Sequence, residues 1–153
     1  MKTIEQIKTD IESRTGTSLV PEGSSLVVPK EKIEAVGTFL KNDPDYQMDY
    51  LSSLTGVDYK EHLEVVYHLY SMGKKEGPIV LKVRTDREKG IVQSVTSVWR
   101  GAEFQEREAF DLLGIHFEGH PDLRRILMWD GFEHYPLRKD YVQDDQDRDP
   151  ENF

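Results

Sequence analysis

Two histidines four positions apart, His116 and His120, are followed by Asp122 and offer the nitrogen and oxygen ligands that a metal ion such as zinc prefers. Ligands at this spacing converge on one ion when they lie on one face of a helix. Gly119 and Pro121 interrupt the segment and argue against a helix there. We therefore expect hydrogen-bonded structural histidines and no metal site, and keep a stand-alone metal-dependent enzyme as an alternative.

Other catalytic chemistry finds little support in the residue types. The chain has no cysteine, which excludes a thiol nucleophile, cysteine-ligated zinc and an iron–sulfur cluster bound by this chain alone. The spacings of a nucleophile elbow, a phosphate-binding loop and a dinucleotide fingerprint do not occur. We expect no catalytic residue and no cofactor-binding residue in this chain.

A carboxylate, Glu106, interrupts an apolar stripe on a predicted helix over residues 99–113. Burial of an unpaired carboxylate costs several kcal/mol, so we expect Glu106 to be paired with a cation, protonated, or facing a partner's groove. A shorter or rotated helix would leave it solvated instead. The stripe consists of Trp99, Ala102, Glu106, Ala109, Phe110 and Leu113, and the cations available by residue type are Arg124, Arg125 and Arg138.

Cationic residues recur in the C-terminal third: Arg124 and Arg125, then Arg138 and Lys139. Guanidinium groups make bidentate contacts with carboxylates, which suits docking on an acidic surface. The alternative is that these charges are solvated and contribute little stability.

The composition is that of one soluble domain with much polar surface. In 153 residues, 29 acidic against 20 basic side chains give a net charge of -9, which repels nucleic acid and anionic lipid. No apolar run approaches the ~20 residues of a spanning helix, and the first ten residues are too polar for a signal peptide. We expect a cytoplasmic protein that meets a membrane only through a partner.

The periodicity of apolar residues predicts an α+β fold, in which a small mixed or antiparallel sheet packs with about three helices. Helices are expected over residues 3–13, 33–40 and 99–113, and the first has a capping box formed by Thr3 and Gln6. Strands are expected over residues 26–28, 46–59, 63–72, 79–85 and 91–97.

After residue 113 the chain changes character, because glycine and proline recur too often for a long helix or a central strand. We predict a core domain over residues 1–113 and an extended partner-binding arm over residues 114–153. The arm's end, residues 140–153, is so acidic that we expect it to be disordered in the isolated chain.

Three segments of this last part resemble a known family. Residues 106–115 (EREAFDLLGI), 119–127 (GHPDLRRIL) and 136–141 (PLRKDY) are similar to the signature of the C subunit of NADH-quinone oxidoreductase, respiratory complex I. The resemblance implies a cofactor-free structural protein of the peripheral arm of the complex. It would dock on the D subunit, a relative of hydrogenase large subunits, and support electron transfer from NADH to quinone, coupled to proton translocation. NADH, FMN, the iron–sulfur clusters and quinone would then be bound by other subunits, on the cytoplasmic side of the inner membrane.

The residues that match the signature are expected to serve partner docking and assembly. One alternative is the equivalent subunit of a membrane-bound hydrogenase, an F420H2 dehydrogenase or a ferredoxin-linked photosynthetic complex. Another is a free-standing acidic binding module whose arm folds back on its own domain. The expected assembly residues are Glu106, Arg107, Glu108, Asp111, His120, Arg124, Arg125, Arg138 and Lys139.

Overall fold

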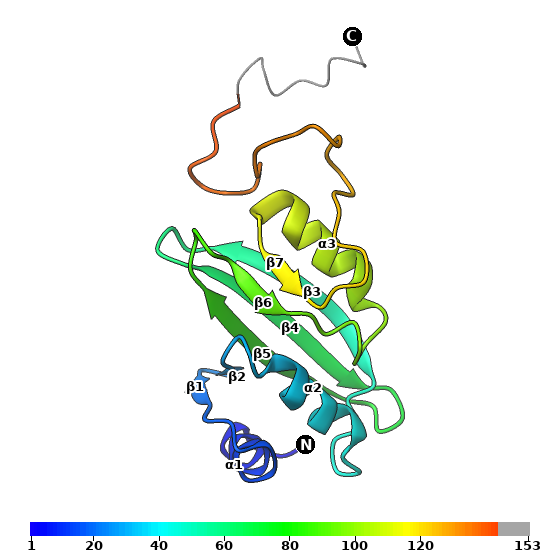
Figure 1. Ribbon diagram of the computed structural model, residues 1–153. Helices are drawn as coiled ribbons and strands as arrows, with labels where there is room; N and C mark the ends of the chain where they lie inside the picture. The colour runs from blue at the N-terminus through cyan, green and yellow to red at the C-terminus, as the bar shows by residue number, and fades with distance from the viewer. Residues whose placement is uncertain (144–153) are drawn as a thin grey trace.

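The computed structural model describes residues 1–143, so most of the predicted disordered tail lies outside the described residues. Figure 1 shows a body of strands and helices from which the C-terminal segment extends at the end opposite the N-terminus. In chain order the elements are α1 (Ile4–Thr15), β1 (Val20–Glu22), β2 (Ser25–Val27), α2 (Ile33–Asn42), β3 (Tyr50–Asp58), β4 (Leu63–Ser71), β5 (Glu76–Thr85), β6 (Ile91–Gln93), α3 (Ala102–Leu113) and β7 (His116–Glu118).

Five strands form one mixed sheet in the order β1-β2-β5-β4-β3. All neighbours in it are antiparallel except β2 and β5, which run parallel. The alternation of apolar and polar residues along β4 and β5 buries every second side chain, as a sheet with one covered face requires. The predicted α+β fold with a mixed sheet and three helices is confirmed.

Local signals account for the helix ends. Thr3 accepts a hydrogen bond from the Gln6 N–H, and the Gln6 side chain accepts one from the Thr3 N–H, which is the predicted capping box. Helix α1 ends at Gly16, and α3 ends at Gly114; both glycines adopt a left-handed conformation.

Two elements differ from the prediction. The strand expected over residues 91–97 is only β6, because the chain turns after Gln93, and α3 begins at Ala102 rather than near Trp99. Strand β7 was not predicted; it pairs in parallel with β6 across the intervening helix. Ile115 and Phe117 are buried in the core, so the segment that leaves the body starts near Gly119.

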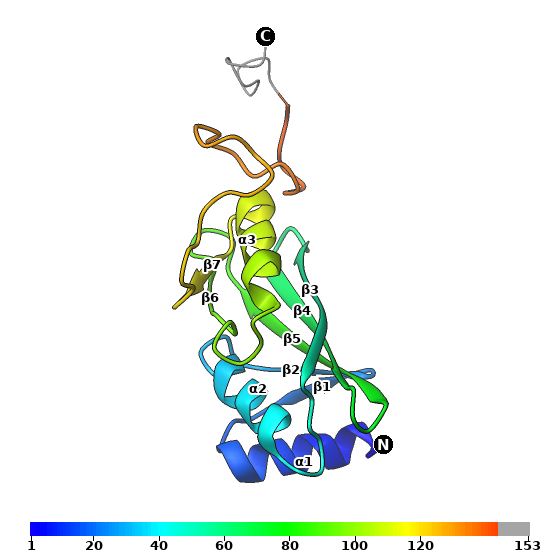
Figure 2. The same cartoon turned by 90° about the vertical axis from the view of Figure 1, so that its right-hand side faces the viewer.

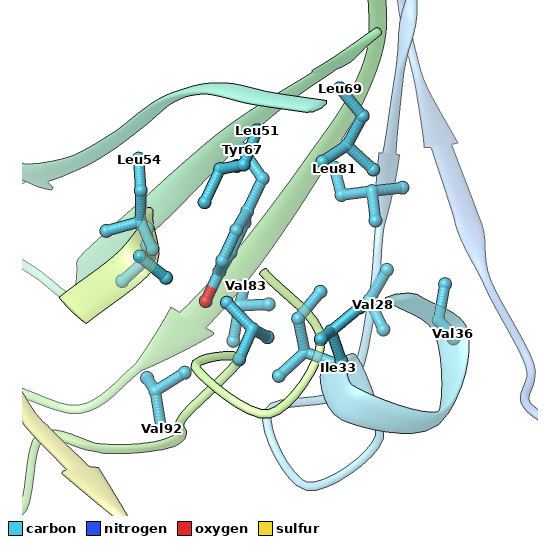
Figure 3. Packing of buried hydrophobic residues seen from close by; sticks show 14 of the residues in the cluster. Val28, Ile33, Val36, Leu51, Leu54, Tyr67, Leu69, Leu81, Val83 and Val92 are labelled. Carbon is cyan, nitrogen blue, oxygen red and sulfur yellow. The ribbon is translucent and has the colours of Figure 1, made fainter. Parts of the chain in front are cut away.

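The core lies between the sheet and helices α2 and α3, which cover the same face (Figures 1 and 2). Figure 3 shows Tyr67 of β4 at its centre, with Leu54 on one side and its hydroxyl end beside Val83. That hydroxyl is buried without a hydrogen-bond partner among the described residues. Within residues 1–143, no helix combines the length and apolarity needed to cross a bilayer.

The contact between α3 and β3 depends on Gly56. A Cβ atom at this position would lie 2.4 Å from Leu113 Cδ1, so Gly56→Ala is expected to lower the free energy of unfolding by about 1–3 kcal/mol. Gly73→Ala is the matched control, because a Cβ there meets nothing within 4 Å. Urea unfolding of both variants measures the difference, and equal stabilities would contradict the packing described.

Candidate functional site

Helix α3 carries three buried charged side chains, Glu106, Arg107 and Asp111. Arg107 and Asp111 are four positions apart and therefore lie on the same side of the helix. Both contact residues 124–128 of the segment that follows β7, which we call the arm and define as residues 119–143. The helix thus provides a charged platform for a segment that has little secondary structure of its own.

Asp111 is fully buried and has no solvent to stabilise its charge. Its Oδ2 accepts hydrogen bonds from three consecutive backbone N–H groups, those of Ile126, Leu127 and Met128, at 3.1, 2.6 and 2.9 Å. Its Oδ1 accepts one from Arg125 Nη1 at 2.8 Å. Burial alone would raise the pKa of this carboxyl, but these four donors outweigh it and hold the pKa below its usual value.

Arg107 and Arg125 complete this attachment. Arg107 donates from Nε and Nη2 to the backbone carbonyls of Arg124 and Arg125, each at 3.1 Å. Arg125 also donates to the carbonyls of Asp111 and His134, and its guanidinium lies over the ring of Phe132, 5.3 Å from the centroid. Two of the predicted cationic docking residues therefore fix the chain's own arm.

A second attachment lies at the C-terminal end of α3. Arg138 donates to the Leu113 carbonyl at 2.7 Å and to the Arg87 carbonyl at 3.2 Å, so it satisfies a backbone acceptor in the last helical turn. The backbone N–H of Lys139 donates to Asp58 Oδ2 at 2.8 Å, and Arg87 bridges Asp58 and Asp140. The arm thus returns to the end of β3.

Glu106 is buried among uncharged donors rather than beside an arginine. Ser94 Oγ donates to its Oε2, and the Val95 N–H donates to its Oε1, both at 2.7 Å. None of the three arginines that the sequence offered is its partner within residues 1–143. Burial raises the pKa of this carboxyl to about 7, and the two hydrogen bonds offset only part of that effect.

The histidines have separate surroundings. His120 contacts the Glu103 carbonyl through Nε2 at 2.9 Å, accepts the Asp122 N–H through Nδ1, and lies 4.0 Å from Glu106. These partners place the proton on Nε2 and make the ring a structural link between α3 and the arm. His116 is exposed and packs edge-on against Phe110. Among the described residues no group of three potential ligands could hold a metal ion.

The remaining predicted residues point outward. Glu108 and Arg124 are exposed, and Arg124 forms a surface ion pair with Asp122 at 2.9 Å. Sequence reasoning missed the exposed apolar residues of the arm, whose relative exposures are 37% for Ile126, 63% for Leu127 and 60% for Leu137. Their signal was present, because apolar residues in an arm that cannot bury them are candidates for contact with another protein.

Comparison with known proteins assigns the chain to one group. The sequence profile of a family described as "Respiratory-chain NADH dehydrogenase, 30 Kd subunit" matches residues 26–147. That range includes the whole sheet from β2 onward, helix α3 and the arm.

Individual relatives carry consistent names. The C subunit of NADH-quinone oxidoreductase from Moorella thermoacetica is 45% identical, with 90% of each chain covered. A second form of this protein, from Rhizobium meliloti, is 50% identical over 76% of this chain and 65% of its own length, so the chain spans somewhat less than two thirds of that relative. A protein of the same name with the combined designation C/D, from Phocaeicola vulgatus, is 47% identical, with 74% of this chain and 22% of the relative covered.

Two solved structures have a similar fold. A trypsin-resistant fragment of Nqo5 aligns with a TM-score of 0.54 and 31% identity, covering 80% of this chain and all of that one. A chain of the membrane-bound sulfane sulfur reductase, described as an archaeal respiratory membrane complex, aligns with a TM-score of 0.64 and 26% identity, covering 92% of this chain and 86% of that one.

Proposed function

Because the chain belongs to the family of the 30 kDa subunit of respiratory-chain NADH dehydrogenase, we propose that it is a structural subunit of the peripheral arm of a NADH-quinone oxidoreductase. In this role it binds no cofactor itself. It positions other subunits that carry NADH, FMN, the iron–sulfur clusters and quinone, and so supports electron transfer coupled to proton translocation.

One observation supports this proposal above the others: the arm is fixed in place while its apolar side chains stay exposed. Four hydrogen bonds to Asp111 and two from Arg107 order residues 124–128 on α3. Leu127 is nevertheless 63% exposed. A segment ordered before binding loses little conformational entropy when it docks, which favours tight association.

The partner that fits best is the D subunit. In the relative from Phocaeicola vulgatus a region like this chain occurs in a protein designated C/D, and two functions in one polypeptide are consistent with direct contact where they are separate. The complex would be attached to the cytoplasmic side of the inner membrane, with this chain peripheral. The body and the arm would then divide the work between folding and docking.

The residues that match the family signature have two proposed roles in assembly. Arg107, Asp111, Arg125, Arg138 and His120 order the arm through contacts within the chain. Arg124, Lys139 and Glu108 are exposed and available to a partner. Glu106 acts indirectly, because it fixes the turn at Ser94 and Val95 that precedes α3.

The decisive experiment is affinity purification of the tagged chain from its native membranes in mild detergent, with mass spectrometry and a NADH-quinone reductase assay. Recovery of the D subunit together with NADH-binding subunits and activity is the expected result. A lone protein with stoichiometric metal would overturn the proposal.

A second candidate is the equivalent subunit of another respiratory membrane complex. The fold likeness to a chain of the sulfane sulfur reductase favours it, because that likeness extends over 92% of this chain. The same purification separates the two candidates, since the second predicts co-purifying subunits without an NADH-binding protein and without NADH-quinone reductase activity.

Docking through the arm predicts a specific mutational effect. Leu127→Asp places a charge on the exposed apolar surface and is expected to weaken binding to the partner roughly 30-fold, the effect of losing a central apolar anchor. The free energy of unfolding of the isolated chain should stay unchanged. Val20→Asp, at a position on β1 that is 60% exposed, is the matched control. Equal recovery of the D subunit with both variants would contradict docking through Leu127.

A further inference from the structure

The outer edge of β3 is a second surface with unused binding capacity. β3 is the last strand of the five-stranded sheet and pairs only with β4 among the strands of residues 1–143. The Leu54 N–H points away from β4, because it donates to the Gln105 side chain at 2.6 Å. Backbone groups alternate in direction along a strand, so the N–H and C=O of Gly56 point the same way.

A groove of about 230 Å³ runs along this edge between β3 and α3. Leu54, Ala109, Leu112 and Leu137 form its apolar part, and Gln105 and Glu108 lie on its α3 side. Its volume is below the roughly 300–1,000 Å³ of sites for small-molecule ligands, so it suits a single apolar side chain. Figure 2 looks toward this edge, with β3 nearest the viewer and the arm beyond its upper end.

We propose that an extended segment of a partner subunit adds a strand to the outer edge of β3, inserts one apolar side chain into this groove and presents a lysine or arginine to Glu108. Strand addition uses backbone hydrogen bonds for affinity and pockets for alternate side chains for specificity. An open edge of a nine-residue strand is also a site of unwanted pairing, which a bound segment prevents.

Charge selects the kind of segment. Glu108 is exposed, and none of its contacts within residues 1–143 is a hydrogen bond or an ion pair. The chain has a net charge of -9, so a basic segment is attracted and an acidic one repelled. A second copy of the chain is disfavoured, because two-fold pairing of β3 edges would bring two Glu108 carboxylates to one interface.

The groove lies directly beside the arm, since Leu137 belongs to both. The inference therefore extends the docking surface of the proposed function and rests on that function for the complex in which the partner is found. It adds what the arm does not supply, namely a site for backbone pairing and a preference for a basic segment.

The test uses the intact complex. The photoreactive amino acid benzoylphenylalanine replaces exposed Ser52 at the groove and, as a control, exposed Glu5 on α1. Irradiation of the cells is expected to crosslink position 52 to a basic segment of another subunit, identified by mass spectrometry. Amide exchange over residues 50–58 should slow at least ~tenfold in the complex relative to the isolated chain, because strand pairing protects N–H groups.

A charge reversal provides a second readout. Glu108→Lys is expected to reduce crosslinking from position 52 about tenfold, whereas Glu118→Lys, at an exposed position on β7, should leave it unchanged. Crosslinks to a second copy, to this chain's own residues 144–153 or to nothing, with unprotected β3 amides, would overturn the inference. If the partner subunits co-purify while these outcomes occur, the groove alone fails; if none co-purifies, the proposed function fails first.

Discussion

Asp111→Ala is expected to lower the free energy of unfolding by about 3 kcal/mol and to release the arm. The substitution leaves Arg125 without its carboxylate and three buried N–H groups without an acceptor, and each unsatisfied group is costly. Urea unfolding measures the stability. Limited trypsin digestion with peptide mapping measures the release, because cleavage after Arg124 and Arg125 should become fast.

Glu108→Ala is the control for this prediction, because Glu108 is exposed on the same helix and its loss should change stability by less than ~0.5 kcal/mol. Asp111→Asn should fall between the two, since it keeps one acceptor and loses the charge. The low pKa of Asp111 adds a pH signature: its contribution to stability is present above the unfolded pKa and is lost as the pH falls through the folded pKa. Unchanged cleavage in Asp111→Ala would show that the arm is held by other contacts.

Glu106→Gln is expected to stabilise the chain above neutral pH by up to roughly 3 kcal/mol, and to remove part of the pH dependence of folding. The folded chain binds the Glu106 proton more tightly than the unfolded chain does, because the pKa rises from 4.5 to about 7. The stability from this group is therefore full below about pH 4.5 and is lost as the pH rises through about 7. Glutamine imitates the protonated form at every pH.

The measurement is urea unfolding of the wild type and Glu106→Gln at several pH values between 4 and 8. The difference between them isolates Glu106 from the other groups that face it, His120, Tyr67 and Ser94. Glu106→Ala is the contrasting variant: it removes the pH dependence too, but it destabilises the chain because Ser94 and the Val95 N–H lose their acceptor. Parallel pH curves for wild type and glutamine variant would rule out a raised pKa.

Much of the fold was predictable because its signals are local. The capping box at Thr3, the alternation along β4 and β5 and the glycine after Leu113 all lie within a few residues of the feature they produce. β7 was not predictable in the same way, because three residues without alternation become a strand only when β6 is already in place to pair with them.

The site divides along the same physical line. The apolar stripe correctly predicted that Glu106 is buried, but its donors are a serine hydroxyl and a backbone N–H in a turn, which no spacing reveals. Asp111 was selected by resemblance alone, and three of its donors are backbone groups whose positions depend on the path of the arm. Whether the nine predicted assembly residues contact a partner stays a prediction.

The three successive N–H groups bound by Asp111 also separate two kinds of information in this chain. The path of residues 126–128 is specified by backbone atoms, which every residue except proline supplies. Their side chains can therefore change without loosening the arm. A complex built on this arrangement can alter its partner specificity at these positions through single substitutions, while the device that presents them remains intact.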